Sequence, residues 1–258
     1  MQEEEKAQAQ CSCCGLCCQK GGATLQKEDM PLVAAGFLPP RVLVTVRAGE
    51  LAYDEAQHSL SPRKAEMVKL AGTGEAAHPW HCVLHRADKL CGIHEHRPAQ
   101  CRALFCRDTA ALEALYAQGQ ATRHEVLLAL PAAQVQGWAA VWAAYEERCA
   151  LELVLPCLLL ARQALEEEAA SKVSSTQAVQ PCPTQAHAVQ QLLDLVRYDY
   201  SFRAACSSKG GIAAENLPFL LGRALPSLLD GAGIKLCLLP EGRLGLGIIG
   251  RNYYAPQA

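Results

Sequence analysis

The sequence has few aromatic residues and no large excess of charge of either sign. Phe, Trp and Tyr together make up 5% of its 258 residues, and the formal net charge is −2. Domains that bind nucleic acids usually carry a basic stripe, or aromatic side chains interleaved with basic ones. The composition therefore gives no reason to expect a nucleic-acid partner.

The sequence also lacks a long apolar run and a basic, apolar leader. Its longest apolar stretch, residues 151–161, is interrupted by Glu152 and Pro156, and a membrane-spanning helix needs roughly 18 to 20 apolar residues. The first ten residues, MQEEEKAQAQ, are acidic and polar, unlike a secretory signal. We therefore expect a cytoplasmic protein with no membrane association, and thiols that remain reduced.

Cysteine, by contrast, is abundant. The chain has 14 cysteines, and half of all its residues are hydrophobic, so it can bury a core without disulfides. Eight cysteines fall in two clusters, CSCCGLCC and CVLHRADKLCGIHEHRPAQCRALFC, and these eight are the candidate metal ligands because thiolates bind soft metals. They are Cys11, Cys14, Cys17, Cys18, Cys82, Cys91, Cys101 and Cys106.

Two kinds of metal centre compete for these thiolates. Zinc takes tetrahedral sulfur or nitrogen ligands, whereas a [4Fe–4S] cluster takes thiolates that often come from a Cys-x2-Cys-x2-Cys run and one remote cysteine. The first cluster contains that run, so an iron–sulfur cluster is favoured and zinc stays open. Cys17 and Cys18 are adjacent, and we expect their side chains to diverge, so that one could serve a second site. Cys13 is interpreted as incidental.

Charged and imidazole side chains surround the second cluster. Arg97 and Arg102 are candidate cofactor-binding residues, because cationic groups stabilise the negative charge of a thiolate-bound cluster. Histidines in this part of the chain could also bind zinc, but a complete set of cysteines makes that the less favoured interpretation. They are His78, His81, His85, His94 and His96.

The pattern resembles the YkgJ-type cysteine-cluster family, also called the zinc- or iron-chelating CxxCxxCC domain. The shared residues are Cys11-x2-Cys14-Gly15-x-Cys17-Cys18, Asp29, Cys82, and Cys91 followed by Arg97-Pro98-x2-Cys101-Arg102-x2-Phe105-Cys106. The resemblance covers roughly residues 10 to 108. It implies that the eight cysteines bind an iron–sulfur cluster or zinc, supported by Arg97 and Pro98. His94 stands where the family usually has Tyr, and the interval 21–81 is long.

The rest of the chain predicts a mainly α fold (α+β class), with a small irregular metal-bound N-terminal domain and a C-terminal β-hairpin. Periodic apolar residues such as Trp138, Val141, Trp142 and Tyr145 indicate packed helices. The predicted parts are a disordered lead-in at 1–9, a cysteine-cluster domain at 10–110, a helical region at 111–165, a linker at 166–188 and a helical piece with the hairpin at 189–258.

Local patterns refine this organisation. Asp29 and Pro31 predict a helix start, with the helix ending at Pro39, and residues 41–46 predict a strand that pairs with 51–60. Further helices are expected at 189–197 and 215–229, and a hairpin at 234–239 and 244–249. Two other patterns have alternative readings: the GxGxxG pattern at 245–250 is interpreted as a strand rather than a nucleotide site, and the 197–203 cluster as core packing rather than a pocket.

These observations support a metalloprotein used in electron transfer or as a redox accessory, with an unknown redox or protein partner. Iron–sulfur oxidoreductases occur among the relatives that the resemblance implies. The alternative is a non-catalytic interaction module folded by zinc. A transferase like the flagellin lysine methylases, which carry a similar cysteine cluster, is less favoured because the sequence has no separate S-adenosylmethionine motif.

Overall fold

A computed structural model describes residues 14–54, 59–75, 77–105, 108–116, 118–173, 183–239 and 243–248. The chain divides into two units: unit 1 comprises residues 1–45 and 67–136, and unit 2 comprises residues 46–66 and 137–258. These units do not follow the predicted domain boundaries, because residues 46–66 group with the C-terminal part and residues 111–136 with the N-terminal part. The predicted lead-in at 1–9 lies outside the described residues. The architecture is mainly helical with short strand pairs, as predicted.

Short helices and one strand pair make up unit 1. They are α1 (Leu16–Lys20), η1 (Lys27–Asp29), α2 (Met30–Ala34), η2 (Pro40–Val42), β1 (Leu43–Val46), β4 (Met67–Leu70), η3 (His94–His96), α3 (Ala99–Ala103), α4 (Ala110–Tyr116), α5 (Arg123–Ala129) and α6 (Ala132–Val135). β1, whose last residue is assigned to unit 2, pairs with β4. Between β4 and η3, the described residues form only turns and isolated bridges.

The core of unit 1 joins three segments that are far apart in the sequence. Leu25 N donates to Val68 O (2.8 Å), Val68 N donates to Ala121 O (3.1 Å), and Ala121 N donates to Leu25 O (2.9 Å). All three side chains are fully buried, so these backbone groups are satisfied in a region without water. This ring of hydrogen bonds fixes the segments on either side of the loop that carries the second cysteine cluster.

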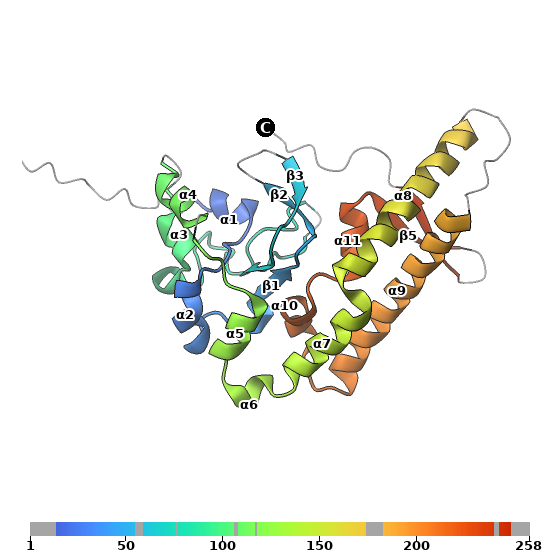
Figure 1. Ribbon diagram of the computed structural model, residues 1–258. Helices are drawn as coiled ribbons and strands as arrows, with labels where there is room; N and C mark the ends of the chain where they lie inside the picture. Colours follow the sequence, from blue (N-terminus) through green and yellow to red (C-terminus); the bar gives the residue numbers. More distant parts are fainter. Residues whose placement is uncertain are drawn as a thin grey trace, which may run out of the picture. The chain divides into compact units, whose positions relative to one another are not determined.

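Unit 2 is built on longer helices. Its elements are β2 (Leu51–Asp54), β3 (Ser59–Pro62), α7 (Trp138–Cys149), α8 (Leu151–Val173), α9 (Pro183–Ser208), η4 (Ala214–Asn216), α10 (Leu217–Leu221), α11 (Leu225–Gly231), β5 (Ile234–Leu238) and β6 (Leu244–Ile248). Helices α8 and α9 lie side by side along much of their length (Figure 1). They bury an apolar seam that includes Val154, Leu158 and Leu192. No helix in the described ranges is long and apolar enough to cross a membrane.

The predicted strand pairing in the N-terminal half is wrong. Strand β1 matches the strand predicted at 41–46, but its partner is β4. The segment 51–60 instead supplies β2 and the start of β3, which pair with each other antiparallel, with Leu51 opposite Pro62. Alternating apolar residues identify a strand but do not specify its partner, and here a nearby segment forms the hairpin.

The helix boundaries also differ from the predicted ones. α8 continues to Val173 and α9 begins at Pro183, so 166–173 and 183–188 of the predicted linker are helical. Ala, Gln and Glu favour helices even without large apolar neighbours. α9 also runs on to Ser208 rather than 197. The helix predicted at 215–229 is interrupted at Gly222, which has φ +76° and separates α10 from α11.

The C-terminal hairpin is confirmed. β5 and β6 pair antiparallel, with Ile234 opposite Ile248 and Cys237 opposite Gly245. Gly245 and Gly247 of the GxGxxG pattern therefore lie within a strand, as predicted, and not at a turn from a strand into a helix. Residues 240–242, between the two strands, lie outside the described residues.

Candidate metal centre

Helix α1 carries two of the cysteines of the first cluster, and Cys14 comes just before it. Gly15 precedes the helix with φ +76°, a conformation that residues with a side chain rarely adopt. Cys14 is exposed, whereas Cys17 and Cys18 are half-buried. Cys11 and Cys13 lie outside the described residues.

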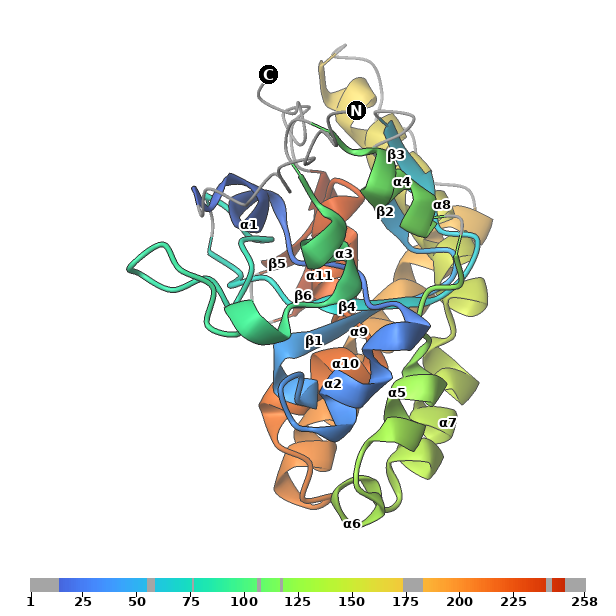
Figure 2. The same cartoon turned by 90° about the vertical axis from the view of Figure 1, so that its left-hand side faces the viewer.

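The second cluster reaches α1 from two other parts of unit 1. Cys82 and Cys91 lie in the loop between β4 and η3, and Cys101 lies on α3. α1 and α3 are close to each other in both views (Figure 1, Figure 2). The backbone N–H of Cys82 donates to the carbonyl of Cys18 at 2.8 Å, which joins the two clusters directly. Cys106 lies outside the described residues.

Cys17 and Cys18 do not diverge as the sequence suggested. Their sulfur atoms are 4.0 Å apart. With Cys18 as the donor, the hydrogen bond between the thiols lowers the pKa of Cys17 to about 6 and raises the pKa of Cys18. Such a pair readily provides a thiolate, the form of cysteine that binds metals.

The remaining described cysteines of the second cluster interact electrostatically with this pair. Burial raises the pKa of Cys101 to about 12, and negative charge on Cys82, Cys91 and Cys17 raises it further. Burial also raises the pKa of Cys82, with a contribution from Cys91. The charges of these thiols therefore act on one another in the fold, and a cation among them would relieve the repulsion between their thiolates.

Asp29 holds the second cluster in place from a distance in the sequence. It is fully buried, and its carboxylate accepts hydrogen bonds from Gln26 N and Ala99 N, both at 2.8 Å. α2 begins directly after Asp29, as predicted, but the Asp29 side chain does not cap α2, because its carboxylate bonds instead to the Gln26 amide at the start of η1 and to Ala99. Because Ala99 is the first residue of α3, the same carboxylate also positions the helix that carries Cys101. Burial raises the pKa of Asp29.

The two candidate arginines, Arg97 and Arg102, donate hydrogen bonds to neighbouring protein atoms. Arg97 Nε donates to His94 O at 2.9 Å, and Arg102 donates to Arg97 O at 2.6 Å and to Glu28 Oε1 at 3.1 Å. Arg97 lies close enough for its charge to oppose the rise in the pKa of Cys101. Arg102 is exposed at the surface, where it connects the turn before α3 to η1.

His85 is one of the five histidines that the sequence made less favoured candidates for zinc ligands. Its Nε2 atom is buried and has no hydrogen-bond partner among the described residues. Its position three residues after Cys82, a spacing common among zinc ligands, was the available signal. The other histidines of the region include His96, which stacks on Phe37 with ring centroids 3.5 Å apart.

The donor chemistry of this region suits a soft metal. It combines clustered thiols with an imidazole nitrogen that lacks a partner, and zinc accepts both kinds of ligand. In the part of the chain that the structure describes, no group of three His, Cys, Asp or Glu side chains is arranged to hold a metal ion. A bound ion would therefore require further donors to turn toward the Cys17 and Cys18 pair.

The described cysteines outside the two clusters differ in exposure. Cys149 and Cys206 are buried, but Cys157 and Cys237 are half-buried. Cys182 lies outside the described residues. None of the ten cysteines within the described ranges is in a disulfide.

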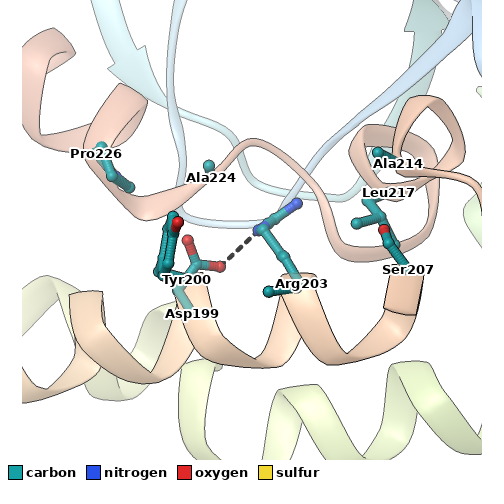
Figure 3. Close-up of a pocket in the computed structure, with 9 residues that line it drawn as sticks. Asp199, Tyr200, Arg203, Ser207, Ala214, Leu217, Ala224 and Pro226 are labelled. Atoms are coloured by element: carbon teal, nitrogen blue, oxygen red, sulfur yellow. Dashed lines mark hydrogen bonds and ion pairs between the residues drawn. The ribbon is translucent and has the colours of Figure 1, made fainter. Parts of the chain in front are cut away.

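A separate cavity of about 250 Å³ lies in unit 2, between α9 and the segments around η4 and α11. Asp199 and Arg203 point toward each other at this cavity (Figure 3), with 2.7 Å between Asp199 Oδ1 and Arg203 Nε. The 197–203 cluster thus lines a pocket, contrary to the preferred interpretation, although Phe202 also packs on the Tyr145 ring, with centroids 5.5 Å apart. Arg203 also donates to the Gly222 and Arg223 carbonyls, so we assign this cavity a structural role.

No protein-family model, curated protein or solved structure matches this chain.

Proposed function

We propose that the cysteines of unit 1 form a metal centre, that zinc is its metal, and that the centre folds a cytoplasmic module for binding a protein partner. The observation that carries the proposal is the convergence of thiols from three separate segments. Cys17 and Cys18 are in contact, Cys82 is bonded through its backbone to Cys18, and Cys101 is influenced by the charges of Cys82, Cys91 and Cys17.

The distance between the two adjacent sulfurs favours zinc. Tetrahedral geometry with Zn–S bonds of about 2.3 Å puts sulfur ligands about 3.8 Å apart. The sulfurs of Cys17 and Cys18 are separated by 4.0 Å. The pair therefore needs little rearrangement to bind one ion.

The loop between β4 and η3 supports a structural role for the metal. Among its described residues, 71–75 and 77–93, only Cys82 is buried, and none lies in a helix or in a strand of more than one residue. Such a segment has too little apolar surface to stabilise itself. Metal binding supplies folding free energy to small irregular domains of this kind. The free thiols in the described ranges agree with a reducing compartment.

An iron–sulfur centre for electron transfer, as in the resemblance to the cysteine-cluster family, is the second candidate. It is favoured by the number of thiols brought together and by Arg97, whose charge acts on Cys101. Cationic neighbours stabilise the negative charge of such a cluster. In that case Arg97 and Arg102 would tune the cluster, and the protein would pass electrons to a redox partner.

Metal analysis of the full chain after anaerobic purification tests both candidates. We expect about one zinc per chain, no acid-labile sulfide and no visible absorption band. Iron, sulfide and a brown colour would instead establish the second candidate.

Serine variants test the ligands. Cys17→Ser and Cys82→Ser should lose most of the metal, whereas Cys157→Ser, a half-buried thiol of unit 2, should keep it. Full metal content in both of the first two variants would refute the proposed centre.

A further inference from the structure

The backbone of the second cluster places His85 against the first cluster. His85 N donates to Cys82 O at 2.9 Å, and His85 forms an antiparallel bridge with Cys91. The Cys82 amide in turn bonds to the Cys18 carbonyl at 2.8 Å. His85 is therefore held between two candidate ligands, at a point where the chain passes α1.

The His85 ring packs directly on the loop of the first cluster. A Cβ atom added to Gly15 would lie 2.6 Å from His85 Nε2 and 2.9 Å from His85 Cε1, distances that real Cβ contacts do not show. Gly15 thus serves two needs, because its φ of +76° and the close approach of the ring both exclude a side chain. The ring nitrogen Nε2 consequently faces the turn that presents Cys17 and Cys18.

The two nitrogens of His85 have very different surroundings. Nδ1 lies 2.6 Å from His81 Nε2, so one of the two rings donates a hydrogen to the other. Nε2 is buried without a hydrogen-bond partner among the described residues. If His85 carries its hydrogen on Nδ1, Nε2 presents a free lone pair on the side of Gly15, the residue that precedes the helix with Cys17 and Cys18. Histidines that bind metals commonly donate their other N–H to a neighbouring acceptor in this way.

We propose that His85 Nε2 is a ligand of the metal centre, and that His81 orients it by accepting the Nδ1 hydrogen. This inference rests on the proposed function, and it specifies a mixed set of sulfur and nitrogen donors. It also selects the metal, because zinc accepts thiolate and imidazole together, whereas the common four-cysteine clusters do not need the nitrogen.

X-ray absorption at the zinc edge of the full-length protein tests the ligand directly. We expect a sulfur shell at about 2.3 Å and a nitrogen shell at about 2.0–2.1 Å. In His85→Gln the nitrogen shell should disappear, and zinc affinity, measured by competition with a chromophoric chelator, should fall at least about tenfold. His81→Gln should weaken binding but keep the nitrogen shell. His78→Gln is the matched control, because His78 is exposed in the same segment, and it should bind zinc as the wild type does.

The outcomes separate this inference from the proposed function. Bound zinc with only sulfur ligands, or an unchanged affinity in His85→Gln, would overturn the role of His85 and leave the metal centre standing. A wild-type chain that binds no zinc would overturn both, and an iron–sulfur cluster with four sulfur ligands would overturn the nitrogen ligand. If His85→Gln does not fold, the ligand shell of the wild-type protein still decides.

Discussion

Replacing Asp199 should strongly destabilise unit 2. The Asp199 side chain is 2% exposed. Its carboxylate accepts hydrogen bonds from Tyr145 Oη (2.6 Å), Arg203 Nε (2.7 Å) and Leu225 N (3.0 Å). Asp199→Ala would therefore leave three donors without their acceptor, and one of these donors is a cation that is itself only 14% exposed.

The expected cost follows from these contacts. Removing one partner of a buried ion pair typically costs about 3–5 kcal/mol. Arg203 keeps its bonds to the carbonyls of Gly222 and Arg223, which places the expected loss near the lower end, at about 3 kcal/mol. Tyr145→Phe removes the hydrogen bond that Tyr145 donates to Asp199 and the longer one that its Oη accepts from Arg203 at 3.4 Å, and it should cost about 1.5–3 kcal/mol. The double variant should cost less than the sum, because both changes remove the same bond.

The measurement is urea unfolding of full-length variants in a Trp80→Phe background. The two remaining tryptophans, Trp138 and Trp142, both lie on α7, so their fluorescence reports unit 2. Asp194→Ala is the matched control on the same helix, since Asp194 is exposed, forms an ion pair with exposed Arg197 and accepts a hydrogen bond from Gln190. It should change stability by less than about 1 kcal/mol. A loss in Asp199→Ala no larger than in Asp194→Ala would refute the reasoning.

Two further predictions concern unit 1. Gly15→Ala should cost more stability than Gly137→Ala and should also weaken zinc binding. Both glycines have positive φ, for which alanine costs about 1–2 kcal/mol. Only at Gly15 would the new Cβ also meet the His85 ring. Equal losses in urea unfolding, with unchanged zinc affinity, would contradict this. Glu125→Gln should destabilise at pH 7, because a backbone hydrogen bond from Thr122, assisted by Lys27, lowers the pKa of Glu125 below 4.5. This stabilisation is present above pH 4.5 and is lost as the pH falls through the lower pKa of the folded state, so the urea midpoints of variant and wild type should converge as the pH is lowered below 4.5. Midpoints that stayed equally far apart would refute the linkage.

The sequence predicted features that depend on local patterns. The apolar runs at 234–239 and 244–249 identified the β5 and β6 hairpin, and Asp29 with Pro31 identified the start of a helix. The partner of β1 could not be predicted, because the same alternation fits several partners and the choice depends on packing in three dimensions. The bond between Tyr145 and Asp199 joins positions 54 residues apart, and no periodicity within either helix indicates it.

In the candidate site, too, local patterns could be predicted and contacts between distant positions could not. Cysteine spacing identified the thiols, but the rule that adjacent side chains diverge was wrong for Cys17 and Cys18. That rule describes the direction of the Cα–Cβ bonds, and a one-turn helix still brings two short side chains to 4.0 Å. The approach of His85 to Gly15 spans 70 residues and depends on the bridge between His85 and Cys91, so the spacing of cysteines alone could not show it.

Unit 1 therefore has one part held by buried apolar side chains and another part that buries almost none. Leu25, Val68 and Ala121 are fully buried and hydrogen-bonded to one another, and this core needs no metal. The described residues from 71 to 93 bury only Cys82, so hydrophobic burial contributes little to holding them. This segment carries His85 and two of the cysteines, Cys82 and Cys91, that are proposed as ligands. In the proposed metal centre, this segment is held by its metal–ligand bonds and by the hydrogen bond that Cys82 N donates to Cys18 O on α1.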